Sequence, residues 1–169
     1  MNRLIVFNNV SLDGYYCTAA GDMSWAHKSA DDAEWQEYTK QNASGGGALV
    51  FGRVTYQMMA SFWPTPQATA MMPEVASHMN SLPKFVFSRT LQSADWQNTT
   101  LLRGDLAEEV ARLKSGAAGR DMAILGSGNL ISQLAQQNLI DEYQLVISPV
   151  VLGGGRSMFA GVTDLRLKL

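Results

Sequence analysis

A glycine-rich turn at residues 126–128 is the first place where this sequence could do chemistry. An apolar run ends in Gly126-Ser127-Gly128, and a helical pattern begins directly after it. Glycines let a backbone approach a ligand closely, and the N-terminus of a helix presents free N–H groups to an anion. The same residues also make an ordinary strand-to-helix connection. The turn is therefore either a phosphate-binding loop or a plain connection. The residues that the fold places beside it distinguish these two interpretations.

Two arginines occur in similar positions. Gly52 and Arg53 stand where an apolar run passes into a helical pattern, and Thr55 follows. Ser88 and Arg89 come directly after the apolar run "KFVF". A guanidinium group presents paired donors that match phosphate oxygens. Each arginine alone is also typical of a solvated surface, so it is their joint placement that indicates a phosphate site.

The elements that position these residues alternate between strand and helix patterns. Several strands are short, continuous apolar runs, which is typical of strands covered on both faces by crossover helices. The sequence therefore predicts an α/β fold, a three-layer α/β/α sandwich with a mostly parallel central sheet. Strands are predicted at 3–10, 45–52, 84–88, 99–102, 121–125 and 142–155, and helices at 29–42, 53–62, 71–82, 105–116 and 129–140.

Such a sheet would gather the polar loops. Ligands of open parallel sheets bind outside the carboxyl ends of the strands. That rule places the loops after Val10, Phe51, Phe87 and Leu125 on one rim. The turn at 126–128 is then one of four neighbouring polar loops, which favours the phosphate-binding interpretation over a plain connection.

Composition limits the classes of protein. Of the 169 residues, 46% are hydrophobic and 17% charged, which predicts one ordered domain over residues 1–169. The net charge of -2 and the lack of a basic block argue against nucleic-acid binding. No apolar run has the length of a membrane span or the form of a secretory signal, so a cytoplasmic protein is expected. Cys17 is the only cysteine, and His27 and His78 fall in no ligand spacing, so no metal site is expected.

Six segments in chain order resemble the dihydrofolate reductase-like family. Within it, they are most similar to stand-alone relatives of the C-terminal reductase domain of the bifunctional riboflavin-biosynthesis enzyme RibD. The segments are "VSLDGYY" (10–16), "GDMSW" (21–25), "VFGRVTY" (50–56), "LPKFVFSRTL" (82–91), "GSGNLISQL" (126–134) and "LIDEYQLVISPVVLGGGRSMF" (139–159).

The resemblance implies NADPH bound across the carboxyl edge of the sheet. Gly52, Arg53 and Thr55 would meet the phosphates at a helix start. Ser88 and Arg89 would lie at the adenosine end, near the 2'-phosphate. The pyrophosphate would be wrapped by the turn and the helix that follows it, with residues Gly126, Ser127, Gly128, Asn129 and Leu130.

The pyrophosphate turn departs from the folate-reducing members of the family in one residue. Those members join a glycine pair by a cis peptide at this turn, whereas Ser127 stands here in place of the second glycine. A cis bond before a residue other than proline costs about 2.5–4 kcal/mol. The geometry of the Gly126–Ser127 bond therefore stays open.

The resemblance also names candidates on the substrate side. Asp13 matches an aspartate that riboflavin-pathway reductases place at the substrate, and its alternative is an Asx turn beside Gly14. Asp32 stands where folate reductases carry a carboxylate, and its alternative is an acid in the first turn of a helix. Trp25 is expected either to line the substrate pocket or to anchor a loop.

The function implied is NADPH-dependent hydride transfer to a small pterin- or pyrimidine-like heterocycle. The enzyme would be similar to dihydrofolate reductase or to 5-amino-6-(5-phosphoribosylamino)uracil reductase. The alternative is a non-catalytic nucleotide-, pterin- or flavin-binding protein on the same fold. Relatives usually continue past "LKL" into a last β-hairpin, so either the sequence is short or these strands are absent. If they are absent, a sheet edge is exposed, and a homodimer through "VISPVVLG" is expected to cover it.

Overall fold

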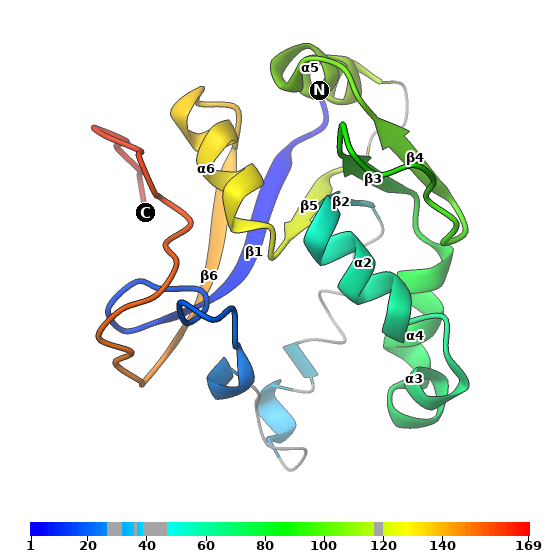
Figure 1. Ribbon diagram of the computed structural model, residues 1–169, viewed down its shortest axis with the longest axis horizontal. Helices are drawn as coiled ribbons and strands as arrows, with labels where there is room; N and C mark the ends of the chain where they lie inside the picture. The colour runs from blue at the N-terminus through cyan, green and yellow to red at the C-terminus, as the bar shows by residue number, and fades with distance from the viewer. Residues whose placement is uncertain (27–31, 36, 39–46, 117–119) are drawn as a thin grey trace.

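The centre of the protein is a six-stranded sheet in the order β4-β3-β2-β5-β1-β6 (Figure 1). The computed structural model describes residues 1–26, 32–35, 37–38, 47–116 and 120–169. Every pairing between neighbouring strands is parallel, which confirms the predicted α/β fold. The strands are β1 (Leu4–Ser11), β2 (Ala48–Gly52), β3 (Lys84–Phe87), β4 (Thr99–Leu102), β5 (Met122–Leu125) and β6 (Glu142–Ser148).

Helices cover both faces of the sheet. Successive residues of a strand point to opposite faces, and β2 shows this directly. Ala48 and Val50 pack with residues of the helices α5 and α6, whereas Leu49 and Phe51 pack with residues of α2 and α4. The result is three layers. The helical elements are η1 (Ser24–Ala26), α2 (Arg53–Phe62), α3 (Pro66–Met71), α4 (Pro73–Ser81), α5 (Leu106–Ser115) and α6 (Gly128–Gln136).

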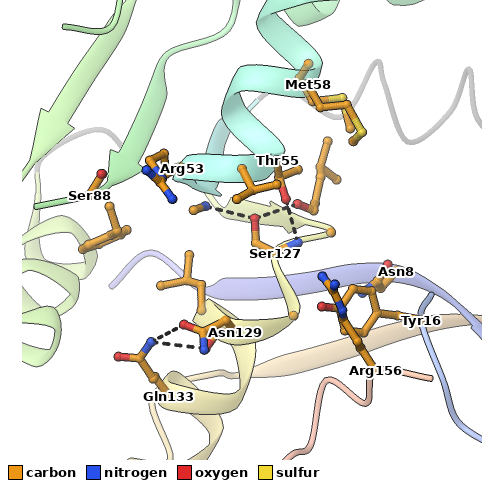
Figure 2. A pocket seen from close by; sticks show the side chains of 18 of the residues that line it. Asn8, Tyr16, Arg53, Thr55, Met58, Ser88, Ser127, Asn129, Gln133 and Arg156 are labelled. Carbon is orange, nitrogen blue, oxygen red and sulfur yellow. Dashed lines mark hydrogen bonds between the residues drawn. The ribbon is translucent and has the colours of Figure 1, made fainter. Parts of the chain in front are cut away.

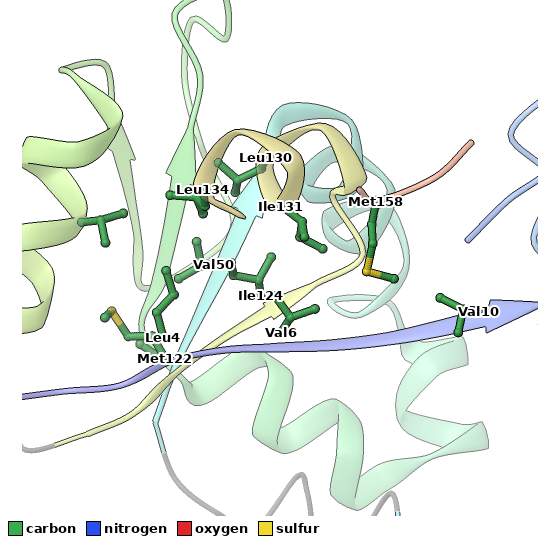
Figure 3. Packing of buried hydrophobic residues seen from close by; sticks show 12 residues of the cluster. Leu4, Val6, Val10, Val50, Met122, Ile124, Leu130, Ile131, Leu134 and Met158 are labelled. Carbon is green, nitrogen blue, oxygen red and sulfur yellow. The ribbon is translucent and has the colours of Figure 1, made fainter. Parts of the chain in front are cut away.

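The helix α6 is held over β1 and β5 by the larger apolar core (Figure 3). Ile131 and Leu134 are fully buried against this sheet face, as are Val6 and Ile124. Because one face of α6 is fixed in this way, the first turn of the helix is held at the carboxyl end of β5. Among the helices of the described residues, none combines the length and the apolar character needed to cross a membrane.

Three predicted boundaries were wrong. The strand predicted at 142–155, with an interruption at Pro149, does not resume after it and ends at Ser148, because Pro149 has no N–H group to continue a ladder. The helix predicted at 71–82 begins at Pro73 and ends at Ser81, and the separate helix α3 ends before it at Met71. The helix predicted to reach residue 140 ends at Gln136, since Asn138 takes a positive φ of 53°.

The helix predicted at 29–42 lies partly outside the described residues. Residues 33–35 and 37–38 are helical, and the rest of the range is not described. The Asp32 carboxylate accepts a hydrogen bond of 2.9 Å from the Trp35 N–H group. This bond has the form of an N-terminal cap, so Asp32 lies directly before the helical residues and not in their first turn.

Candidate functional site

The carboxyl ends of β1, β2, β3 and β5 open onto one cavity of about 790 Å³ (Figure 2). Cavities of this size are typical of small-molecule and cofactor sites. All ten residues predicted to bind the cofactor line it. The parallel topology therefore brings together loops that are far apart in the chain.

The first turn of α2 contributes free donors to this cavity. Its first N–H groups, from Arg53 onward, have no acceptor within the helix. Gly52 caps the helix without a side-chain hydrogen bond to it, and the first turn holds no acid. The Arg53 side chain is exposed on the cavity wall and forms no ion pair with a described residue. This end of α2 carries a positive charge and a favourable dipole for an anion.

The Ser127 side chain ties the start of α2 to the turn before α6. Its Oγ accepts a hydrogen bond of 2.9 Å from the Gly52 N–H group. In return, the Ser127 N–H group donates to Thr55 Oγ1 at 3.0 Å (Figure 2). We call this pair of bonds the serine latch. It means that Thr55 joins two loops at the cavity wall in addition to lining it.

The turn that carries the latch has an unusual backbone. Gly126 and Ser127 both take positive φ values, of 57° and 58°. For Ser127 this left-handed conformation costs about 1–2 kcal/mol, and the latch bonds offset it. A Cβ atom on Gly126 would lie 3.2 Å from the Thr55 methyl carbon. Among the described residues all peptide bonds are trans, so the open question about the Gly126–Ser127 bond is answered.

The start of α6 contributes mainly backbone groups to the cavity. A Cβ atom on Gly128 would lie 2.2 Å from the Tyr16 ring, so only glycine fits there. Leu130 is buried in the core, which leaves its N–H group as its contribution to the cavity. Asn129 is exposed and accepts a hydrogen bond of 2.6 Å from Gln133 Nε2. The first turn of α6 contains no acid.

The loop after β3 closes the far end of the cavity. Ser88 Oγ accepts hydrogen bonds from the N–H groups of Thr90 at 3.2 Å and Leu91 at 3.0 Å. These bonds fix the turn that carries Arg89. Arg89 is exposed on the cavity wall and pairs with no described acid. Ser88 and Arg53 lie on the same side of the cavity in Figure 2.

Asp13 lies outside the cavity wall. Its carboxylate accepts hydrogen bonds from the Ser11 hydroxyl at 2.7 Å and from the N–H groups of Leu152 at 3.1 Å and Gly153 at 2.8 Å. The Ser11 hydroxyl, together with these two N–H groups, holds the pKa of Asp13 below its ordinary value. Asp13 therefore joins the loop after β1 to the loop after β6, instead of facing a ligand in this structure.

Asp32 and Trp25 are also absent from the described wall of the cavity. Asp32 caps a helical segment, as described above. Trp25 is half-buried in η1, and its indole N–H group has no acceptor among the described residues. The structure thus brings together the predicted cofactor residues but not the predicted substrate residues.

Several residues of the cavity wall were missed in the sequence, among them Asn8, Tyr16 and Arg156. Asn8 did carry a signal, because it interrupts an otherwise apolar strand pattern. Tyr16 and Arg156 meet through an isolated antiparallel bridge between Cys17 and Arg156. No local pattern in the sequence could have paired these two segments.

The fold and the site define a reductase-like α/β protein, and comparison with known proteins assigns the family. The model of the RibD C-terminal domain matches residues 2–169, so the chain belongs to the RibD C-terminal domain family. The uncharacterized protein YyaP of Bacillus subtilis (strain 168) is 29% identical over 160 residues, covering 95% of this chain and 81% of YyaP. A second uncharacterized protein of that organism, YwjB, is 24% identical, with 98% and 89% covered.

Solved structures agree with this assignment. A candidate riboflavin biosynthesis protein from Shewanella sp. PV-4 is 27% identical, with a TM-score of 0.68, covering 92% of this chain and 82% of that one. The bifunctional deaminase and uracil reductase of Thermotoga maritima shares the fold at 14% identity and a TM-score of 0.68, covering 99% of this chain and 51% of that one. Schistosoma mansoni dihydrofolate reductase shares it at 18% identity and a TM-score of 0.53, with 89% and 76% covered. Family and fold together indicate a reductase-type function.

Proposed function

We propose that this protein is an NADPH-dependent reductase that transfers a hydride to a small pterin- or pyrimidine-like heterocycle. The observation that carries the proposal is the serine latch. It holds two helix N-termini, those of α2 and α6, at fixed positions on one cavity. Two adjacent anion sites of this kind suit a ligand with linked phosphates.

The residues present fit the parts of NADPH. The free N–H groups of α2 and the Arg53 guanidinium suit one phosphate of the pyrophosphate. The Gly126–Ser127 turn and the start of α6 suit the other, because the first N–H groups of a helix have no acceptor within the helix and its dipole favours an anion. Arg89 extends the positive wall toward the loop after β3, where a 2'-phosphate would bind.

The protein's part in the reaction is to bind and orient. When bound, the cofactor would supply the hydride, which no side chain can donate. The loops of this chain fix the cofactor against the sheet edge and leave the end of the cavity near β1 for a second molecule. Backbone carbonyl and amide groups at the edge of the sheet near β1 would then orient this second molecule through hydrogen bonds.

A charge-neutral variant of Arg89 tests the proposal. NADPH should bind the parent protein at least tenfold more tightly than NADH, since a charge-assisted hydrogen bond contributes about 1.5–3 kcal/mol. Arg89→Gln should remove most of that preference while NADH affinity changes less than about threefold. Fluorescence titration of both cofactors measures this, with Arg166→Gln, an exposed arginine outside the cavity, as the matched control. Equal affinities of the parent protein for NADPH and NADH would contradict the assignment.

A second candidate is a binding protein without catalysis. It is favoured by the location of Asp13 and Asp32 outside the described cavity wall, which leaves no described carboxylate to act as an acid. The absorbance of NADPH at 340 nm, followed with a panel of oxidised pterins and pyrimidines, separates the two. Tight cofactor binding without oxidation of any panel member would favour the binding protein.

A further inference from the structure

The loop after β3 is held by a side chain that does not line the cavity. Arg103 follows directly after β4, the outer strand beside β3 (Figure 1). Its Nη2 atom donates hydrogen bonds to the carbonyls of Leu91 at 2.7 Å and Gln92 at 3.1 Å. The described cavity wall includes the residues on either side of Arg103 but not Arg103 itself. Arg103 therefore holds this loop from outside the cavity, whereas Arg89 of the same loop lines it.

The two ends of the segment 88–92 have further anchors. At its start, the Ser88 N–H group donates to the Leu102 carbonyl at 3.0 Å, which continues the pairing of β3 with β4. Toward its end, the half-buried Leu91 side chain packs against the apolar core on the α2 side of the sheet. Loss of the guanidinium bonds would thus free the turn that carries Arg89 without removing either anchor.

Arg89 depends on such a fixed backbone, because its side chain is long and exposed. A free arginine side chain loses rotamer freedom when it binds a ligand, and a mobile backbone adds to that cost. Arg89 pairs with no described acid, so the turn has to position its guanidinium group. A fixed turn keeps this charge at the cavity wall before a ligand arrives.

The guanidinium group of Arg103 suits the task of holding the loop. Both of its bonds reach consecutive carbonyls, and a charged donor makes a stronger hydrogen bond than a neutral one. A lysine ammonium group can hold carbonyls in the same way, as Lys84 does for three others in this protein. Methionine has a similar length and no donor, so it would leave the two carbonyls without this partner.

We propose that Arg103 is a positioning residue for Arg89, and that the two arginines together set the selectivity of the cavity for a dinucleotide with a 2'-phosphate over one without it. This inference rests on the proposed function, because it takes the loop after β3 as the site of the 2'-phosphate. Arg103 acts through the backbone of residues 91 and 92 and does not touch the ligand.

A double-mutant cycle tests this indirect action. NADPH and NADH are titrated by fluorescence into the parent protein, Arg89→Gln, Arg103→Met and the double variant. Arg103→Met should weaken NADPH about fivefold and NADH less than about twofold, because the turn must then be ordered on binding. In the Arg89→Gln background, Arg103→Met should change neither affinity by more than about twofold. Equal weakening of NADPH in both backgrounds would mean a direct contact or a general charge effect, and would overturn the proposal.

Two further variants serve as rescue and control. Arg103→Lys can donate to the same two carbonyls, so its NADPH affinity should stay within about twofold of the parent. Arg166→Gln, an exposed arginine outside the cavity, controls for the loss of one positive charge. Thermal melts of Arg103→Met check that the fold survives, as the two remaining anchors of the loop predict.

A measurement without ligand tests the hold on the loop itself. Nitrogen-15 relaxation of the amides of residues 89–92 should give order parameters of about 0.85 in the parent, as in rigid backbone, and below about 0.6 in Arg103→Met. The amides of β3 should keep their values in both proteins. Unchanged, rigid order parameters at residues 89–92 in Arg103→Met would overturn the proposal.

The measurements separate this inference from the proposed function. If the parent prefers NADPH and Arg89→Gln abolishes the preference but Arg103→Met retains it, the proposed function stands and the positioning role is wrong. If the parent binds NADPH and NADH equally, both fail, since the loop then has no selectivity to set.

Discussion

At the scale of single residues, Asp13 is best understood as a link between the loops that follow β1 and β6. Its carboxylate joins the loop after β1 to residues 152 and 153, and the same loop carries Tyr16. The Ser11 hydroxyl connects Asp13 to the rest of the loop after β1, since it donates to Asp13 and accepts from the Tyr15 N–H group. Asp13 thus holds the loop after β1 against the loop after β6.

Asp13→Asn should lower the melting temperature by a few degrees, because the amide cannot accept from Ser11, Leu152 and Gly153 together as the carboxylate does. The pKa of Asp13 is lower in the folded state, so its stabilisation is fully present above the unfolded pKa of about 3.9 and is lost as the pH falls through the folded value. Calorimetric melts from pH 7 to pH 3 should show the parent–variant difference constant down to about pH 5 and shrinking below about pH 4.

The control for this change is Asp164→Asn, an exposed aspartate outside these loops. NADPH affinity should stay within about threefold of the parent in both variants. A loss of NADPH binding in Asp13→Asn alone would instead make Asp13 part of the cofactor site.

How far single residues could be predicted depended on whether their partners were local. Gly52, Arg53 and Gly126 stand at strand ends, and a parallel sheet brings all strand ends of one kind to the same rim. The motif "SLDG" is compatible with a ligand contact and with a turn, and the choice is made by Leu152 and Gly153 from the far end of the chain. Local sequence carries no record of such a contact.

At the scale of elements, Lys84 fixes the amino end of β3. Its side chain is completely buried, and Nζ donates to the carbonyls of Asn80 at 3.1 Å, Leu82 at 2.8 Å and Gln97 at 3.1 Å. The ammonium group lies 4.4 Å from the centre of the Trp96 ring. Burial lowers the pKa of Lys84 to about 8. One side chain thereby joins the end of α4, the start of β3 and the approach to β4.

Lys84→Met should destabilise the fold by about 1–3 kcal/mol, because buried carbonyls lose their donor. NADPH affinity should be unchanged, since Lys84 lies at the opposite end of β3 from the cavity. The unfolded pKa of 10.5 exceeds the folded value of about 8, so the unfolded state binds more protons between these values. Urea melts at pH 7.5 and 9.5 should show parent stability rising relative to Lys84→Met.

A lysine outside the fold's interior provides the matched control. Lys168→Met should leave the urea midpoint unchanged at both pH values, because this side chain is exposed. Equal midpoints for the parent and Lys84→Met at pH 7.5 would contradict the structural role of Lys84.

Element boundaries were predictable where one residue type forces them. The helix at 53–62 and the strand at 99–102 match the predicted ranges, and Asp105 caps α5 through hydrogen bonds from Ala107 and Glu108. Pro149 was expected to interrupt the strand at 142–155, whereas the strand β6 ends before it at Ser148. Proline can either interrupt an element or end it, and the surrounding packing decides between these outcomes.

At the scale of the whole molecule, the strand β6 forms one edge of the sheet. An unpaired edge exposes N–H and C=O groups that can pair with another chain. Ile147 on this strand is 62% exposed, and no described strand pairs with the outer side of β6. We expect a homodimer that buries this edge.

Light scattering at micromolar concentration should give twice the chain mass of 18.4 kDa. Ile147→Lys should weaken the dimer at least tenfold, because a buried charge would lie in the interface. Met71→Lys changes an equally exposed apolar residue on α3 and should leave the mass unchanged. A parent protein of single chain mass would contradict the expectation.

The position of β1 sets the order in which the chain can fold. This first strand lies between β5 and β6, with Leu4 opposite Met122 and Ile5 opposite Glu142. During synthesis its two partners are the last strands to leave the ribosome, whereas β2, β3 and β4 are contiguous and can pair much earlier. The apolar β1 segment therefore remains without its partner strands until nearly the whole chain has been synthesised. Slow synthesis or truncation would leave an incomplete sheet, because β5, which joins β1 to β2, belongs to the C-terminal third of the chain.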